Sequence, residues 1–526
     1  MRFSSRRGAA LLSGLLLAGV VALATVLERE HETPQPTPPP VARELRGVWV
    51  TPLDAMTGPD WPSRPGLTPD QQRAELRAML DKAKAIGLNA IVLHVRTASD
   101  AMYPSKLVPW SAFLSGKSGV GPSPAYDPLA FAIAETHARG MQFHAWFNPF
   151  RAMLPIFEGK AAPTHVTRAH RSWIRKYGTQ TWIDPGEPAA RAAVLKEMME
   201  VVEKYDIDAI HLDDYFYPYR EQRTIIRRVR GRRVRVREDI PFPDATTWQK
   251  YGGAKRGYPD RAGWRRANID RFVEQLYAET KKRKPWVLVG ISPFGIWRSG
   301  VPRGVTGLDA YGEIYADARK WLVEGWVDYM APQLYWPLQG PQRRFTNLDD
   351  WWRTQNPKGR AIWPGLFDAQ VAVGREGWSV REIPAQIERL RLTREMTDES
   401  NGHIHFRMGA LLHNYHAVGE RLRTTVYAEP ALFPATPWLG GAPPAPPRVT
   451  STILEAIDVG PGDPTTIAWW MIQTLGTDGR WRMTLRRATE RRITLRSLGE
   501  IGGNVIAVTA VDRAGQTSAA TLFELP

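Results

Sequence analysis

The chain has 526 residues, of which 43% are hydrophobic, so it is long enough for two or three domains with cores of their own. It contains no cysteine, which excludes disulfide bonds and a lipid-modified cysteine. The formal net charge is +16, and the 21 tryptophans exceed what packing alone usually requires. Sugar-binding clefts are one place where such an excess of rings is used.

The first 27 residues have the pattern of a signal peptide or an N-terminal anchor. Basic residues at positions 2, 6 and 7 precede an apolar run over 9–24 that ends in Ala-Leu-Ala. Because this run is slightly short of a membrane span, we expect export, with an uncleaved anchor as the alternative. The expected location is the periplasm or the cell envelope. Residues 28–43, with the sequence PQPTPPP among them, are expected to form an extended spacer.

Between residues 44 and 433, short apolar runs alternate with amphipathic stretches. Helices are predicted at 69–86, 128–139, 188–205, 264–284 and 383–394. Strands are predicted at 46–51, 90–96, 142–148, 209–215, 287–294, 327–336, 361–367 and 410–414. Eight strands alternating with helices predict an α/β fold, the (β/α)8 TIM barrel. The connections after strands two, three and four are long, and a barrel carries its active-site loops at that end of its strands.

Nine arginines lie between Arg220 and Arg237. The alternation of Ile, Val and Arg on either side of Gly231 predicts a basic β-hairpin insertion at about 220–238. One interpretation is contact with an anionic polymer or a membrane surface, and the other is a solvated arm. Nucleic acid is not an expected partner, because an exported protein rarely meets it.

A proline-rich linker is predicted at 434–448, and residues 449–526 then have an all-β pattern. Strands are expected at 465–472, 481–487, 493–498 and 505–511. The final segment VIAVTAVDRAG resembles the last hairpin of fibronectin type III-like modules, so a small all-β sandwich is predicted after the barrel. We expect this module to act in spacing or docking.

The segment IHLDDYFYP at 210–218 is the strongest functional signal in the chain. It predicts a buried strand that ends in two carboxylates, Asp213 and Asp214, beside tyrosines. Carboxylate pairs at the carboxyl end of a strand are typical of acid-catalysed cleavage of a sugar bond, and a sugar ring can stack on the aromatic rings beside them. Since residues two apart on a strand share a face, the last inward positions of three consecutive strands place Arg96, Asn148 and Asp213 at the barrel mouth.

Several motifs in chain order resemble one bacterial family. They are ELRGVWVT, SDAMYPS, YDPLAFAIAETHARGMQFHAWFNPFRA, DPGEPAAR, IHLDDYFYPY, GISPFGIWR and YADARKWLVEGWVDYMAPQLYW. Together they resemble the glycosyl-hydrolase-like 10 family over roughly residues 44–428. The resemblance implies an exported glycosidase that cleaves peptidoglycan glycan strands lacking stem peptides. The segment IWPGLFDAQV departs from the family pattern, so the resemblance assigns no role to Asp368.

The two carboxyls are expected to have different roles. Adjacent residues at a strand end cannot easily flank a bond from both sides, as a protein nucleophile and an acid must. Peptidoglycan sugars carry 2-acetamido groups, which can themselves attack the anomeric carbon. We therefore expect Asp213 to orient the acetamido group and Asp214 to protonate the leaving oxygen, or the reverse. Repulsion between such close carboxylates raises one pKa, as a general acid near neutral pH requires.

Substrate binding is assigned to polar and aromatic residues that follow the strands. Arg96 or Arg298 is expected to pair with the lactyl carboxylate of a muramyl sugar. Asn148 and Gln333 are expected to hydrogen-bond sugar hydroxyls. Stacking walls are predicted from Tyr215, Tyr217, Tyr335 and Trp336, although the last two have a purely structural interpretation as caps of the barrel rim. Nothing in the sequence demands a cofactor.

Three other functions stay open at this stage. Histidines on three successive strands, His94, His144 and His211, suggest a metal-dependent deacetylase or amidohydrolase with Asp213 as a further ligand. A non-catalytic protein that binds cell-wall glycan is the second alternative, and a glycosidase for another exported polysaccharide is the third. Further candidate acids are Asp54, Asp100, Asp184 and Glu313.

Overall fold

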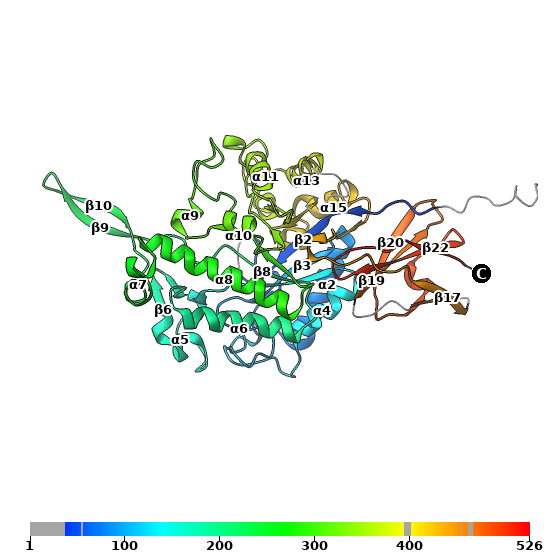
Figure 1. Ribbon diagram of the computed structural model, residues 1–526, viewed down its shortest axis with the longest axis horizontal. Helices are drawn as coiled ribbons and strands as arrows, with labels where there is room; N and C mark the ends of the chain where they lie inside the picture. The colour runs from blue at the N-terminus through cyan, green and yellow to red at the C-terminus, as the bar shows by residue number, and fades with distance from the viewer. Residues whose placement is uncertain (1–36, 54–55, 394–400, 454, 461–465, 526) are drawn as a thin grey trace, which may run out of the picture.

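The computed structural model describes residues 37–53, 56–393, 401–453, 455–460 and 466–525. The predicted signal segment and most of the spacer lie outside these residues. In the described ranges, no helix combines the length and the apolar character needed to cross a membrane. The molecule is elongated: a central barrel lies between a two-stranded hairpin at one end and an all-β module at the other (Figure 1).

The central sheet consists of parallel strands and closes on itself, as the sequence predicts. Its strands are β2 (Leu45–Val50), β3 (Ala90–Arg96), β4 (Gln142–Phe147), β8 (Ala209–Leu212), β11 (Leu288–Ile291), β12 (Tyr329–Met330), β13 (Ala361–Ile362), β14 (Gly365–Leu366) and β15 (Gly402–His405). The sheet order is β13-β12-β11-β8-β4-β3-β2-β15-β14. Only Trp363 and Pro364 separate β13 from β14, so these two are halves of one strand and the barrel is complete.

The last barrel strand is not where the sequence predicts it. The predicted strand at 410–414 is wrong, because this apolar run belongs to helix α14 (Met408–Leu412) and the turn after it. The strand is β15, which contains His403 and His405 and pairs with β2. Both histidines are buried and hydrogen-bond the Tyr427 hydroxyl. Their polar character hides the strand from a search for apolar runs.

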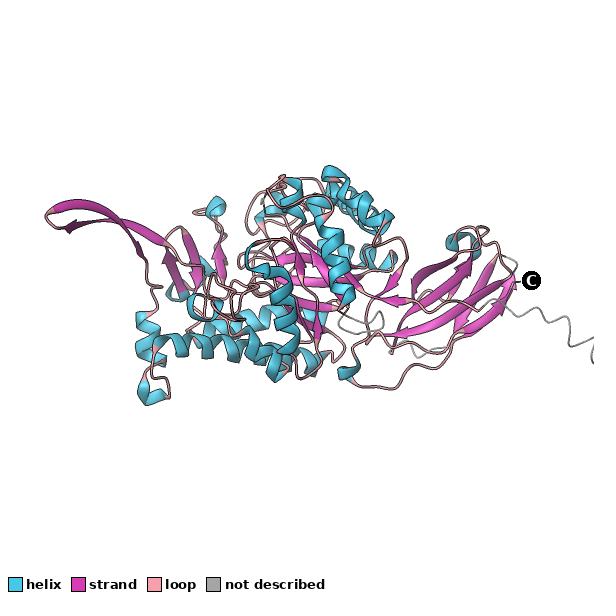
Figure 2. Ribbon diagram, turned by 90° about the horizontal axis from the view of Figure 1, so that it is seen from above, coloured by secondary structure: helices cyan, strands magenta, loops and turns pink. Residues whose placement is uncertain are grey.

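Helices surround the barrel (Figure 2). Those of seven residues or more are α2 (Pro69–Ile86), α4 (Pro128–Ala138), α6 (Pro188–Lys204), α7 (Ala245–Tyr251), α8 (Arg261–Arg283), α10 (Ala318–Glu324), α11 (Arg344–Thr354), α13 (Glu382–Leu392) and α15 (Val418–Thr424). Shorter ones are α3 (Ala112–Ser115), α5 (Val166–Ala169), α9 (Ala310–Glu313) and α12 (Asp368–Ala372). Helix α2 has the predicted bounds because Thr68 and Gln71 form a capping box at its start and Gly87, with φ of 104°, ends it.

The long connections after β4 and β8 carry extra strands. After β4, the strands β5 (Arg151–Met153), β6 (Ile174–Tyr177) and β7 (Gln180–Ile183) form a sheet in the order β5-β7-β6. After β8, the strands β9 (Gln222–Val229) and β10 (Arg232–Asp239) form an antiparallel hairpin where the alternation of Ile, Val and Arg predicts one. Both insertions follow the carboxyl ends of barrel strands.

The C-terminal module contains two antiparallel sheets. One has β17 (Arg448–Ile453), β18 (Ala456–Gly460) and β21 (Arg492–Thr494), and the other has β19 (Ile467–Leu475), β20 (Trp481–Arg487), β22 (Val505–Asp512) and β23 (Thr521–Glu524). The strand predicted at 493–498 is shorter, because residues 495–498 form a 3-10 turn. The resemblance of this module to fibronectin type III domains remains a prediction.

This module covers the amino-terminal ends of the barrel strands. Trp469, Met471 and Leu485 share one hydrophobic cluster with the first residues of several barrel strands, such as Leu45 and Ala209. The short strands β1 (Ala42–Arg43) and β16 (Ala431–Leu432) pair beside this contact. The opposite, carboxyl-terminal end of the barrel is therefore the end available for a site.

Candidate active site

A cavity of about 320 Å³ lies at the carboxyl ends of the barrel strands, within the range typical of small-molecule sites. Its walls are largely aromatic, and two carboxyls lie among them. It is lined by Trp49, Thr51, Leu53, Met56, His94, Trp146, Arg151, Asp213, Asp214, Tyr215, Ser292, Gln333, Tyr335, Phe367, Phe406 and Arg407. A larger groove of about 860 Å³ lies on the outer helices α6 and α8, where charged side chains line it.

Asp213 is held by N–H donors from two neighbouring elements. Trp146 Nε1 donates to Oδ2 at 3.2 Å, and Asn148 Nδ2 donates to both carboxylate oxygens at 3.3 and 3.1 Å. The backbone N–H of Tyr215 adds a longer bond of 3.4 Å. Burial raises the pKa of Asp213 to about 7; the positive charge of Arg151 opposes this rise and the charge of Asp214 adds to it. Asn148 therefore holds Asp213 in place, as their predicted convergence implies.

Asp214 has a different environment although it is the next residue. The hydroxyl of Tyr219 donates a hydrogen bond to its Oδ2. Burial raises the pKa of Asp214, and hydrogen bonds from Tyr219 and Gln333 oppose the rise. Both carboxyls are almost fully buried, so they titrate as a coupled pair that retains a proton near neutral pH.

The chemistry of the donors decides where a shared proton lies. The N–H groups of Trp146, Asn148 and Tyr215 can only donate, so they favour the ionised form of Asp213. A hydroxyl such as that of Tyr219 can donate or accept, so it tolerates a proton on Asp214. The arrangement therefore suits an ionised Asp213 beside a protonated Asp214.

Arg151 is a residue of the cavity that the sequence analysis did not single out. It begins β5, and its guanidinium lies 4.7 Å from the ring centre of Tyr215. Its backbone N–H donates to Asn148 Oδ1 at 2.9 Å, which couples it to the residue that holds Asp213. The sequence FNPFRA could have indicated its position, because this arginine follows the end of β4 by only a few residues and so lies at the mouth of the barrel.

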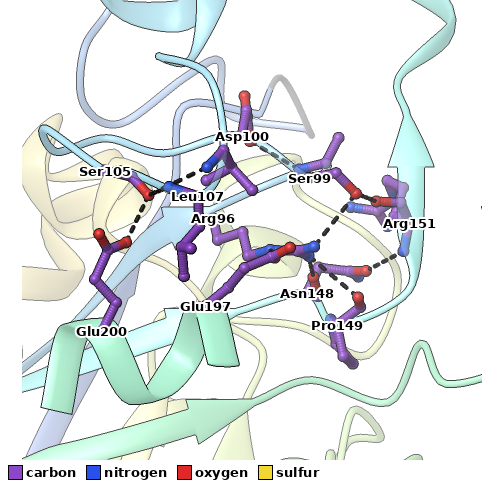
Figure 3. Close-up of polar contacts among 12 residues, drawn as sticks. Arg96, Ser99, Asp100, Ser105, Leu107, Asn148, Pro149, Arg151, Glu197 and Glu200 are labelled. Carbon is purple, nitrogen blue, oxygen red and sulfur yellow. Dashed lines mark hydrogen bonds and ion pairs between the residues drawn. The ribbon is translucent and has the colours of Figure 1, made fainter. Parts of the chain in front are cut away.

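Arg96 does not line the cavity, which corrects its predicted role in binding substrate. The pairing of β3 with β4 shifts between His94 and Arg96, so the alternation of faces is broken there. Arg96 consequently points to helix α6, where its Nε donates to Glu197 at 2.7 Å (Figure 3). It also donates to the carbonyl oxygens of Asn148 and Pro149, and so supports the loop that follows β4.

Three further predicted residues lie away from the cavity. Arg298 is exposed, 3.9 Å from Asp309 and over the ring of Tyr311. Tyr217 is buried against Phe242 and belongs to a separate cavity near the base of the hairpin. Trp336 packs edge-on against Phe294, in accord with its structural interpretation.

Three predicted binding residues do line the cavity: Tyr215, Gln333 and Tyr335. Most residues of the aromatic wall are not among the predicted binding residues. Its other members are Trp49, Trp146, Phe367 and Phe406. They come from four different strands or strand ends, so their sequence separation conceals their common position.

Two of the barrel histidines, His144 and His211, form a neutral hydrogen-bonded layer below the cavity, whereas His94 lines the cavity itself. Trp49 Nε1 donates to His211 Nε2 at 3.0 Å, so His211 carries its proton on Nδ1, which faces the Tyr329 hydroxyl at 2.9 Å. That hydroxyl is then free to donate to His144 Nδ1 at 3.0 Å. Burial lowers the pKa of His144 to about 4 and keeps His94 neutral as well. In the described ranges, no three His, Asp or Glu side chains gather as a metal site would require.

The remaining candidate acids have local partners. Asp100 accepts from the backbone N–H groups of residues 97 and 98, and Asp184 pairs with Arg175 and Thr247. Glu313 lies 3.5 Å from Arg220. Asp54 lies outside the described residues. The buried pair of Asp213 and Asp214 is thus the carboxylate group that lines the cavity.

A (β/α)8 barrel with a buried carboxylate pair at the carboxyl ends of its strands is an architecture that glycoside hydrolases use. Within that class, the chain belongs to the glycosyl hydrolase-like 10 family, whose model matches residues 44–376. It is 37% identical to glycosyl hydrolase YngK of Bacillus subtilis over 78% of this chain and 76% of the relative. It is 34% identical to glycosyl hydrolase DigH of Escherichia coli, over 59% of this chain and 70% of the relative. Among solved structures, the PgaB glycoside hydrolase domain of Bordetella bronchiseptica is 15% identical with a TM-score of 0.45, over 73% of this chain and 98% of that one.

Proposed function

We propose that the protein is an exported glycosidase that cleaves peptidoglycan glycan strands lacking stem peptides, at bonds between 2-acetamido sugars. The observation that carries the proposal is the buried pair of Asp213 and Asp214 inside an aromatic cavity. The membership of the chain in a glycosyl hydrolase-like family supports hydrolysis of a glycosidic bond. The proposed location is the periplasm or the cell envelope.

In the proposed reaction, the acetamido carbonyl oxygen of the substrate attacks the anomeric carbon. The bond from that carbon to the glycosidic oxygen breaks, and Asp214 gives its proton to the departing oxygen. Asp213, ionised and held by Asn148 and Trp146, accepts the acetamido N–H and stabilises the positive charge on the cyclic intermediate. Asp214, now ionised, takes a proton from the water that opens this intermediate.

Arg151, one of the two arginines that line the cavity, supports the choice of substrate. The lactyl carboxylate of a muramyl sugar forms the amide bond to the stem peptide, so it is a free anion only in strands without that peptide. Arg151 lines the cavity near the carboxylate pair and is suited to such an anion. It takes the role that the sequence analysis gave to Arg96 or Arg298. Gln333, Tyr215 and Tyr335 are proposed to bind and stack on the sugar rings.

The test compares the protein with Asp214→Asn and Asp213→Asn variants on peptidoglycan strands with and without stem peptides. Mass spectrometry of the released fragments should show new reducing ends from the peptide-free strands only. Each variant should lose at least a hundredfold in kcat, because Asp214→Asn removes the general acid and Asp213→Asn removes the charge that stabilises the cyclic intermediate. Asp478→Asn, a change at an exposed carboxylate in the C-terminal module, is the matched control and should keep full activity. Full activity in either cavity variant would refute the mechanism.

A further inference from the structure

The hairpin of β9 and β10, with the residues at its base, carries nine arginines within 18 residues (220–237). Three of its nine arginines have acidic partners: Arg220 pairs with Asp239 and Glu313, while Arg223 and Arg227 pair with Glu238. The other six are exposed, and no ion pair joins them to any described residue. They are Arg228, Arg230, Arg232, Arg233, Arg235 and Arg237. So many uncompensated cations on one ribbon repel each other unless an anion lies beside them.

The register of the hairpin gathers four of these cations on one face. Arg233 is opposite Arg228, Arg235 is opposite Ile226, and Arg237 is opposite Thr224, so Arg228, Arg233, Arg235 and Arg237 share that face. Arginines two apart on β10 repeat every ~7 Å. The other face carries Arg232, together with Arg223 and Arg227 and their partner Glu238, while Arg230 lies in the turn. The uncompensated arginines of the two strands therefore lie mainly on one side.

Exposed aliphatic side chains accompany the arginines. Ile226 is 61% exposed and Val234 is 42% exposed, although β-branched residues of this size are normally buried. An anionic polymer in water would not bury these two side chains. A lipid surface would, because aliphatic groups enter the boundary between headgroups and acyl chains while arginines bind headgroup phosphates. The combination favours a lipid surface.

We propose that the hairpin docks the protein on a lipid surface whose headgroups carry phosphate anions. The hairpin projects from the end of the barrel opposite the C-terminal module (Figure 1). With strands of eight residues each, it reaches ~27 Å beyond its base. Docking by the tip would thus face the mouth of the barrel toward the lipid surface and hold it at about that distance. This inference does not depend on the proposed reaction.

The test measures co-sedimentation of the full chain with vesicles. One set contains equal parts of phosphatidylglycerol and phosphatidylcholine, and the other contains phosphatidylcholine alone. The protein should bind the anionic vesicles selectively. A triple variant at Arg233, Arg235 and Arg237, each changed to Gln, should bind them roughly a hundredfold more weakly, since each arginine near an anionic surface contributes about fivefold.

Two further variants separate the explanations. The matched control changes Arg480, Arg491 and Arg496 of the C-terminal module to Gln; these are exposed arginines, and the change removes the same charge at the opposite end of the molecule. It should bind as the unchanged protein does; an equal loss would overturn the proposal. A variant with Ile226→Ser and Val234→Ser should bind vesicles less but soluble polyphosphate unchanged. Vesicle binding that survives this change would replace the lipid surface with an anionic polymer.

Discussion

Replacing Arg96 by Met tests whether this residue supports the fold or binds substrate. The guanidinium is fully buried and donates to Glu197, to two backbone carbonyls and to Ser99. Its removal leaves the mostly buried Glu197 carboxylate without its cation. Breaking such a pair costs about 3–5 kcal/mol, a large part of the ~5–15 kcal/mol that stabilises a typical protein. We expect Arg96→Met to lower Tm by about 5 °C or more.

The pH dependence of this loss gives a second readout. Burial raises the pKa of Glu197, and Arg96 opposes that rise, so the variant should raise it further. An acid whose pKa is raised in the folded state costs stability only where the unfolded chain ionises, above about pH 4.5. The difference in Tm between the two proteins should therefore be larger at pH 8 than at pH 5.

The control is the double variant Arg96→Met with Glu197→Leu. It removes both charges, so it should recover most of the lost stability in thermal unfolding followed by circular dichroism. Unchanged Tm in the single variant, together with a raised KM, would refute the structural role and restore Arg96 as a substrate ligand.

Three other predictions concern the cavity and the histidine layer. With the pKa of Asp213 at about 7, kcat/KM for glycan cleavage should rise as pH rises through that value, because the proposed reaction uses ionised Asp213, and a flat profile from pH 5.5 to 8 would contradict that role. Arg151→Gln should move this rise to higher pH, because Arg151 lowers the pKa of Asp213, and should raise KM at least tenfold for strands with free lactyl carboxylates but not for chitin oligomers. The pKa of His144 is near 6.5 in the unfolded chain and about 4 in the folded protein, where burial lowers it. The stability that goes with the neutral form, up to about 3 kcal/mol, is fully present above pH 6.5 and is lost as pH falls toward 4. A His144→Gln variant should lose less Tm than the unchanged protein between pH 7 and 4.5.

The pattern of residues along the chain determined the barrel and located its carboxylate pair. Helix α2 is bounded by its own capping residues, and most strands are apolar runs, so local signals sufficed for them. Asp213 and Asp214 follow such a strand directly, which is why the sequence alone placed them at the carboxyl end of the barrel. The strand that contains His403 and His405 was not predicted, because its burial depends on hydrogen-bond partners distant in the chain.

Which side chains meet in the cavity was decided only by the tertiary structure. A register shift after His94 turns Arg96 outward to Glu197, and nothing in the alternation of residues records that shift. The loop after β4 then brings Arg151 into the cavity in its place. Local sequence specifies the direction of a regular strand, but irregular pairing and long loops are set by contacts between distant residues, because the energy that selects them comes from packing rather than from propensity.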